Sequence, residues 1–159
     1  MKKTLMIALV VALALSCVVA PAAMAKKKKQ PFAGSFKGTT ESGTPISLNV
    51  TKGGQVNNVT GSVYVFCVSL QSTQTRAGVD TFQPPAGPKL GQTVQNSALQ
   101  PSFVAARDVT KTYTTTVRRA GKRAVTGELR LSFSYFVPDL YAPKTFFCSG
   151  TTPFSASRG

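Results

Sequence analysis

The longest alternating segment of the chain runs from Val125 to Val137, and it constrains the fold class most strongly. Its odd positions are mostly apolar, and the positions between them are mostly polar or charged. A period of two predicts a β-strand with one face in a core and the other in water. The residues expected to face the core are Leu129, Leu131, Phe133 and Tyr135, with Arg130, Ser132 and Ser134 on the opposite face.

The same period recurs through most of the chain after residue 25, and no segment there repeats its apolar residues at the helical spacing. The pattern predicts an all-β domain of about seven to nine antiparallel strands. A β-sandwich, immunoglobulin-like or similar, is the architecture we expect, and a small closed β-barrel is the alternative. Further strands are predicted at 46–51, 56–60, 63–68, 112–117, 146–148 and 150–157.

The first 25 residues have the three parts of a secretory signal peptide. Lys2-Lys3 gives a positive start, an apolar run extends from Thr4 to Ala20, and Ala23-Met24-Ala25 matches the small-residue pattern before a cleavage site. We expect cleavage before Lys26 and a secreted or extracellular product, with no membrane span in the mature chain. A permanent membrane anchor and a lipid anchor at Cys17 are the alternatives, although the residues before Cys17 are in the wrong order for lipidation.

Two cysteines remain once the predicted signal is removed, and they are 81 positions apart. An even number of cysteines in an exported chain indicates a disulfide rather than a metal or catalytic site. We therefore predict a Cys67–Cys148 disulfide. Cys67 lies in the segment Val63–Val68, which is apolar at nearly every position and is expected to be a central strand covered on both faces.

Between Gln71 and Pro101 the alternation is lost, and prolines cluster at 84–88. We expect a long irregular loop at about 71–101 within a single domain that covers residues 32–159, with a short strand at Val94 or Leu99 as the alternative for that part of it. A surface loop without a function is the alternative to a functional one. Long loops in small domains often carry function. Such a loop could bind another protein, as in an inhibitor-like module, through the apolar residues Phe82, Pro84, Pro85, Pro88 and Leu90.

The chain is strongly basic, with 19 Lys and Arg against five acidic residues and a formal net charge of +14. The mature chain would keep 17 basic residues and a net charge of +12. This charge favours polyanions, which for an exported protein are anionic cell-wall polymers or lipid headgroups. Nucleic acid is not an expected partner, because exposed aromatic residues are not interleaved with the basic ones.

The basic residues are densest in two segments, a flexible tail at 26–31 and a predicted hairpin tip at 118–123. Either segment could hold the domain against an anionic envelope. The alternative is that both are simply solvated and keep the surface soluble. The candidate polyanion contacts are Lys26, Lys27, Lys28, Lys29, Arg118, Arg119, Lys122 and Arg123.

Catalytic chemistry has few candidates here. The sequence contains no histidine, which is the commonest general base and metal ligand. Its five acidic residues are scattered, and Glu128 is expected to pair with a neighbouring arginine on the surface. We therefore expect a non-enzymatic protein with no catalytic residues, no bound metal and no cofactor.

Several turn glycines, the two cysteines and the alternating segments form a recognisable combination. The chain resembles a group of small, uncharacterised exported proteins from high-GC Gram-positive bacteria, of the actinobacterial type. The resemblance implies an exported all-β domain and no particular activity. It covers about residues 32–158 and is carried by Gly38–Thr40, Gly43–Val50, Gly53-Gly54, the strand ending at Cys67, Val125–Phe133 and Cys148–Ala156.

Overall fold

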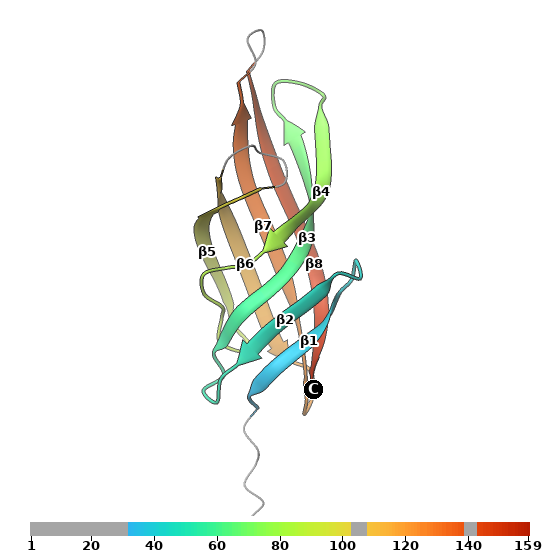
Figure 1. Cartoon of the computed structure of the whole chain (residues 1–159), viewed down its shortest axis with the longest axis vertical. Coiled ribbons are helices and arrows are strands. Elements are labelled where there is room, and N and C mark those ends of the chain that lie inside the picture. The colour runs from blue at the N-terminus through green and yellow to red at the C-terminus, as the bar shows by residue number, and fades with distance from the viewer. Residues whose placement is uncertain (1–31, 103–107, 139–142) are drawn as a thin grey trace, which may run out of the picture.

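Eight antiparallel strands form one continuous sheet in the computed structural model of the chain (Figure 1). The structure describes residues 32–102, 108–138 and 143–159, and no helix occurs within these ranges. The predicted all-β antiparallel fold is therefore confirmed. The strands are β1 (Gly34–Thr40), β2 (Pro45–Val50), β3 (Val56–Ser69), β4 (Thr75–Phe82), β5 (Thr93–Gln100), β6 (Val109–Arg119), β7 (Ala124–Val137) and β8 (Lys144–Arg158).

The centre of the fold is a closed ring of four strands. Strand β8 pairs with β3 through residues 146–149 and with β1 through residues 154–158. The β1–β2 hairpin fills the gap that opens where β3 and β8 diverge, because β2 in turn pairs with the first half of β3. Cys67 and Cys148 face each other across the β3–β8 pairing and form the predicted disulfide.

Beyond the ring the sheet continues as two arms. Strand β4 extends one arm from β3, and β7, β6 and β5 extend the other from β8, giving the order β4-β3-β2-β1-β8-β7-β6-β5. The arms face each other across the core, where the ring of Phe82 on β4 lies edge-on to Tyr113 on β6 with centroids 5.1 Å apart. The fold thus has the closed centre of the barrel alternative, and its arms pack face to face as the layers of a sandwich do.

The core is built from the inward positions of every long strand, as the alternation predicted. Leu129 and Leu131 are fully buried, and Phe133 and Tyr135 are nearly so. On β6, Tyr113, Thr115 and Val117 share the buried face, and on β8 Phe154 and Ala156 share a face with Cys148. Burial of apolar side chains at about 25 cal/mol per Å² drives the sheet to close on itself.

Two glycines allow the ring to close tightly. A Cβ atom at Gly38 on β1 would overlap the carbonyl oxygen of Ser155 on β8. A Cβ atom at Gly150 on β8 would overlap the carbonyl oxygen of Tyr64 on β3. Glycine is therefore required where the backbones of β1, β3 and β8 approach one another most closely.

The prediction of an irregular loop over 71–101 is wrong for most of that segment. Residues 75–82 form β4 and residues 93–100 form β5, the two strands at the ends of the sheet. Only Asp80 and Phe82 of β4 are buried, and β5 alternates between exposed and half-buried residues. Edge strands of this kind bury little apolar surface, so their sequences lack the strong alternation of β7.

The connection between β4 and β5 is also held to the body of the protein. The amide of Gln55 donates a hydrogen bond to the carbonyl of Gly87 at 2.7 Å, and the backbone N–H of Val56 donates to the carbonyl of Pro88 at 2.9 Å. Phe82, Pro84 and Pro88 are buried and Leu90 is half-buried, which leaves Pro85 as the only exposed member of the predicted recognition set. The surface expected for protein recognition is therefore largely packed into the fold.

Candidate functional site

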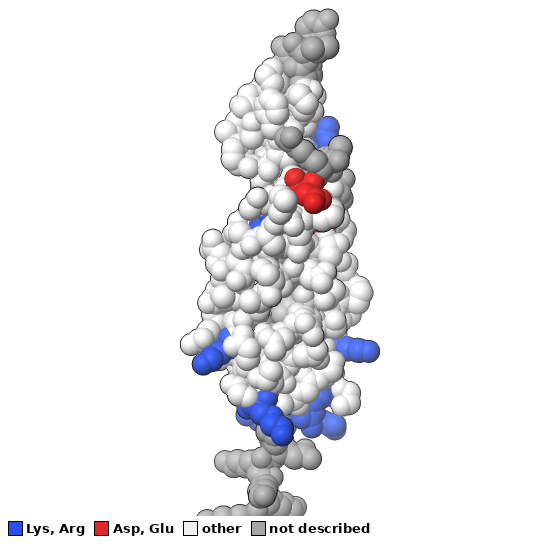
Figure 2. Space-filling view, turned by 60° about the vertical axis from the view of Figure 1, so that its left-hand side comes forward, with Lys and Arg blue, Asp and Glu red and all other residues white. Residues whose placement is uncertain are grey.

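One end of the elongated molecule collects basic side chains (Figure 2). The β6–β7 turn, the β2–β3 turn, the end of β8 and the start of β1 all reach this end, as the hydrogen bonds between them show. We call it the basic end and define it by seven residues. They are Lys52, Lys89, Arg118, Arg119, Lys122, Arg123 and Arg158.

The four residues predicted at the hairpin tip, Arg118, Arg119, Lys122 and Arg123, are exposed. The structure adds three cations that lie far away in the sequence. The backbone N–H of Arg158 donates to the carbonyl of Arg123 at 2.8 Å, which places the end of β8 against the tip. Lys52 lies in the β2–β3 turn and Lys89 in the β4–β5 connection, and the backbone N–H of Leu90 donates to the carbonyl of Gly54 to hold these two segments together. Sequence reasoning missed all three cations because they come from three separate parts of the chain.

Acidic residues do not neutralise the basic end within the described ranges. The described residues form two ion pairs, Lys111–Asp80 and Arg130–Glu128, and neither pair involves one of the seven cations of the basic end. The Glu128–Arg130 pair is the surface contact expected from the sequence, with a separation of 3.7 Å. The positive charges at the basic end therefore repel one another unless an external anion binds.

The chain enters the described part of the structure at this same end. The guanidinium of Arg119 stacks over the ring of Phe32 at 4.3 Å, and Arg158 donates a hydrogen bond to the carbonyl of Ala33 at 2.7 Å. The other predicted contacts, Lys26–Lys29, lie outside the described residues. The predicted signal peptide and the alternative anchor at Cys17 lie outside them as well.

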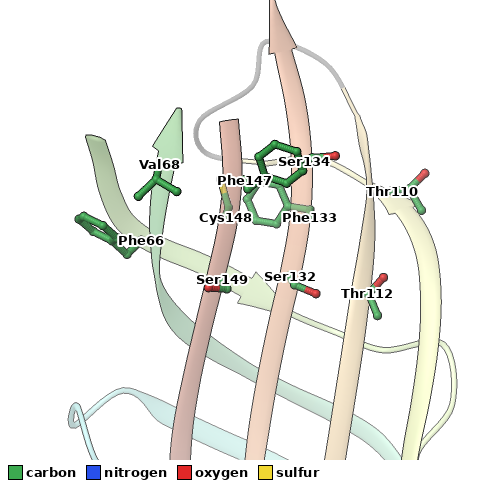
Figure 3. Close-up of a pocket in the computed structure, with 10 residues that line it drawn as sticks. All are labelled: Phe66, Val68, Thr110, Thr112, Ser132, Phe133, Ser134, Phe147, Cys148 and Ser149. Carbon is green, nitrogen blue, oxygen red and sulfur yellow. The ribbon is translucent and has the colours of Figure 1, made fainter. Parts of the chain in front are cut away.

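A second exposed feature is a shallow groove of about 640 Å³ on the outer face of β3, β8, β7 and β6 (Figure 3). Phe66, Val68 and Phe147 lie on one side of it and serine and threonine hydroxyls on the other. Three of these hydroxyl residues, Thr112, Ser132 and Ser149, are paired across the adjacent strands β6, β7 and β8. Aromatic rings can stack on a ligand, and the hydroxyls beside them can hydrogen-bond to it. Among the described residues, no charged side chain lines the groove.

The groove corrects one prediction about β3. The apolar run Val63–Val68 was expected to be covered on both faces, but only its odd positions are buried. Tyr64 and Phe66 are 55% and 49% exposed. The strand is central within the sheet, since β4 and β8 flank it, and one face of the sheet is nevertheless open to solvent.

A third feature, missed from the sequence, is a polar cluster inside the core. The ammonium of Lys111 on β6 lies 2.7 Å from Oδ1 of Asp80 on β4, and the two side chains are 0% and 4% exposed. Next to this pair the hydroxyl of Tyr113 donates a hydrogen bond to Oε1 of Gln100 at 2.5 Å. Lys111 is in phase with Tyr113, Thr115 and Val117, and this phase was the one signal that could have placed it inside.

Tyr113 provides a pH-dependent test of this cluster. Burial, and to a lesser extent the negative charge of Asp80, raise the pKa of Tyr113 to about 12 from the usual tyrosine value of 10.0. Because the folded state holds this proton more tightly than the unfolded state, its contribution is complete below pH 10 and is lost as pH rises toward 12. The expected loss is roughly 2 to 3 kcal/mol.

The measurement is the urea midpoint of the native chain and of Tyr113→Phe at about pH 9 and at about pH 11.5. The variant has no hydroxyl to titrate, so its stability should fall less over this interval than that of the native chain. Equal losses in the two proteins would contradict the burial of this hydroxyl.

Comparisons with known proteins add no family to this geometry. No protein-family model, curated protein or solved structure matches the chain. Within the described ranges no group of three or more histidine, cysteine or acidic side chains could hold a metal ion. The part of the chain that the structure describes also has no helix long and apolar enough to cross a membrane.

Proposed function

We propose that this protein is an exported, non-enzymatic domain that binds anionic polymers or lipid headgroups of the cell envelope through its basic end. The observation that carries the proposal is the gathering of seven cations at one end of the molecule without an acidic partner among the described residues. A concentrated positive field of this kind attracts polyanions and accelerates their capture. Export is supported by the signal-like leader and by a disulfide, which persists in oxidising compartments.

The predicted basic tail adds to the same end. Lys29 precedes Phe32 by three residues, and a chain extends at most about 3.6 Å per residue, so Lys29 remains within roughly 11 Å of it. Phe32 itself contacts Arg119. Covalent connectivity therefore keeps Lys29 within reach of the basic end, where its charge adds to the attraction for a polyanion.

A salt titration tests the proposal with two kinds of anion. We expect the protein to bind vesicles that contain phosphatidylglycerol, and to bind soluble polyphosphate, at roughly 0.05 M salt and to be released near 0.5 M, because screening shortens the reach of surface charges to a few ångströms. The triple variant Arg118→Gln, Lys122→Gln, Arg123→Gln should lose at least about tenfold in affinity, since each cation near an anionic surface contributes to binding.

The matched control removes three charges that lie away from the basic end. Arg76 on β4 lies opposite Cys67 in the β3–β4 ladder, and Lys144 on β8 lies opposite Val137 in the β7–β8 ladder, so both lie toward the disulfide end. Arg130 lies part-way along β7. Changing Arg76, Arg130 and Lys144 to glutamine gives the same net charge as the triple variant. Equal losses in both variants would mean that only net charge matters and would overturn a site at the basic end. Preference for vesicles over polyphosphate would identify the lipid as the partner, and the reverse preference would identify a wall polymer.

A further inference from the structure

The two ends of the sheet meet at a buried ion pair. Strand β4 ends one arm, β5 and β6 lie at the end of the other, and within the described ranges no backbone ladder joins β4 to either of them. Asp80 and Lys111 cross this gap with an Oδ1–Nζ separation of 2.7 Å. Most buried charges in proteins are paired, but removing both members of a pair from water still costs several kcal/mol per ion.

Each oxygen of the Asp80 carboxylate has its own hydrogen-bond donor. The backbone N–H of Thr81 donates to Oδ1 at 2.8 Å, and the hydroxyl of Ser102 donates to Oδ2 at 3.3 Å. Around Lys111 the surroundings are aromatic, because its Nζ lies 5.8 Å from the centroid of Phe133, and Phe82 packs on Tyr113 nearby. The Lys111 nitrogen is thus held against the Asp80 carboxylate in a buried site, with a further donor already placed on each carboxyl oxygen.

We propose that Lys111 and Asp80 condense to an intramolecular amide that joins β6 to β4 covalently. The ammonium first transfers a proton to the carboxylate, which yields a neutral amine beside a carboxylic acid. That proton goes to Oδ1, the oxygen that Nζ contacts. The amine nitrogen then attacks Cγ of Asp80, and the negative charge that develops on Oδ2 is stabilised by the hydroxyl of Ser102. The hydroxyl on Oδ1 takes a second proton from the nitrogen and leaves as water, and the charge on Oδ2 returns to form the amide carbonyl.

The step balances without any other reactant. A C–N bond forms, a C–O bond breaks, nothing is oxidised or reduced, and one water molecule is released. Fixing the two groups in contact supplies the large effective concentration that intramolecular reactions enjoy. The product is neutral, so the cost of burying two charges disappears, and the exclusion of water disfavours hydrolysis.

Peptide mapping of the full chain, denatured and reduced, tests the proposal. Trypsin cleaves after Lys and Arg but not after a lysine whose amine is in an amide. A tryptic digest of the cross-linked chain would therefore contain one species in which residues 77–89 are joined to residues 108–118, and the chain would not be cut after Lys111. Its mass should equal the sum of the two peptides less one water molecule. Recovery of 77–89, 108–111 and 112–118 as separate peptides would overturn the proposal.

The control variant is Lys111→Arg, which keeps a positive charge near Asp80 and carries no primary amine. Its map should show an unlinked 77–89 peptide at full mass. If 77–89 from the variant were also lighter by one water, the loss would come from dehydration within that peptide, and the cross-link would be rejected. The map reads covalent structure after denaturation, so it does not depend on how well the variant folds or on binding by the basic end.

Discussion

Changing Cys67 and Cys148 together to alanine is expected to lower the free energy of unfolding by about 4 kcal/mol. The disulfide joins residues 81 positions apart, and in the chain-entropy model a loop of this length restricts the unfolded chain by roughly 4–5 kcal/mol. Both sulfur atoms are buried, so alanine is a better replacement than serine, which would bury a hydroxyl. Chemical denaturation of the two proteins under oxidising conditions measures the difference.

Two measurements separate the cross-link from the packing of its sulfur atoms. The native chain denatured in the presence of a reductant keeps both sulfur atoms, so its loss reports the cross-link alone and should account for most of the effect. Loss of the β3–β8 pairing should also be visible as faster amide exchange of β3 and β8 near the disulfide. A change below about 1 kcal/mol in the alanine variant would contradict the chain-entropy account of this bond.

Strong local patterns explain which parts of the fold could be predicted. The alternation of β7 combines large apolar residues with a strict period of two, and Leu129 and Leu131 were placed correctly because nothing else satisfies that pattern. The disulfide followed from counting, since only Cys67 and Cys148 remain after the predicted signal. These features depend on a few neighbouring residues or on composition, and both are visible in a single sequence.

Features that depend on closure of the sheet could not be predicted in the same way. Strand β5 buries little, and its half-buried positions hold residues such as Asn96 and Gln100, so its period is weak. Lys111 has the phase of a core residue, but a lysine is normally assigned to the surface. Its partner, Asp80, is 31 residues away in a segment with no clear pattern, and the two meet only because the arms of the sheet face each other.

The candidate binding site also combines residues that the sequence alone could identify with residues that only the fold brings together. The Arg118–Arg123 tip is a local cluster and was found directly, whereas Arg158 and Lys89 reach it through the path of the whole chain. The structure also places the disulfide and the basic end in different parts of the molecule. β8 runs from the disulfide end to the basic end, and its 15 residues span roughly 45 Å at the rise of a β-strand. A ligand at the basic end would therefore lie far from the Cys67–Cys148 disulfide and from the Lys111–Asp80 ion pair.

Lys111→Met is expected to destabilise the fold by about 3–5 kcal/mol, because it leaves the Asp80 carboxylate in the core without a positive partner. If the native chain carries the proposed amide, the variant loses a covalent cross-link as well, so the change is destabilising in either case. Methionine has nearly the volume of lysine and fits an apolar surrounding, so a cavity should contribute little. Urea denaturation at pH 7 measures the loss.

The double variant Lys111→Met, Asp80→Leu is the matched control. It removes both charges and fills the space with apolar side chains, which in other buried pairs is often neutral or even stabilising. It should therefore be more stable than Lys111→Met alone by about 2 kcal/mol or more. If the single and double variants unfold at the same urea concentration, the carboxylate of Asp80 does not suffer from the loss of its partner and must reach solvent. In that case the two arms of the sheet would be open at this edge, and the ionic link across them would have to be abandoned.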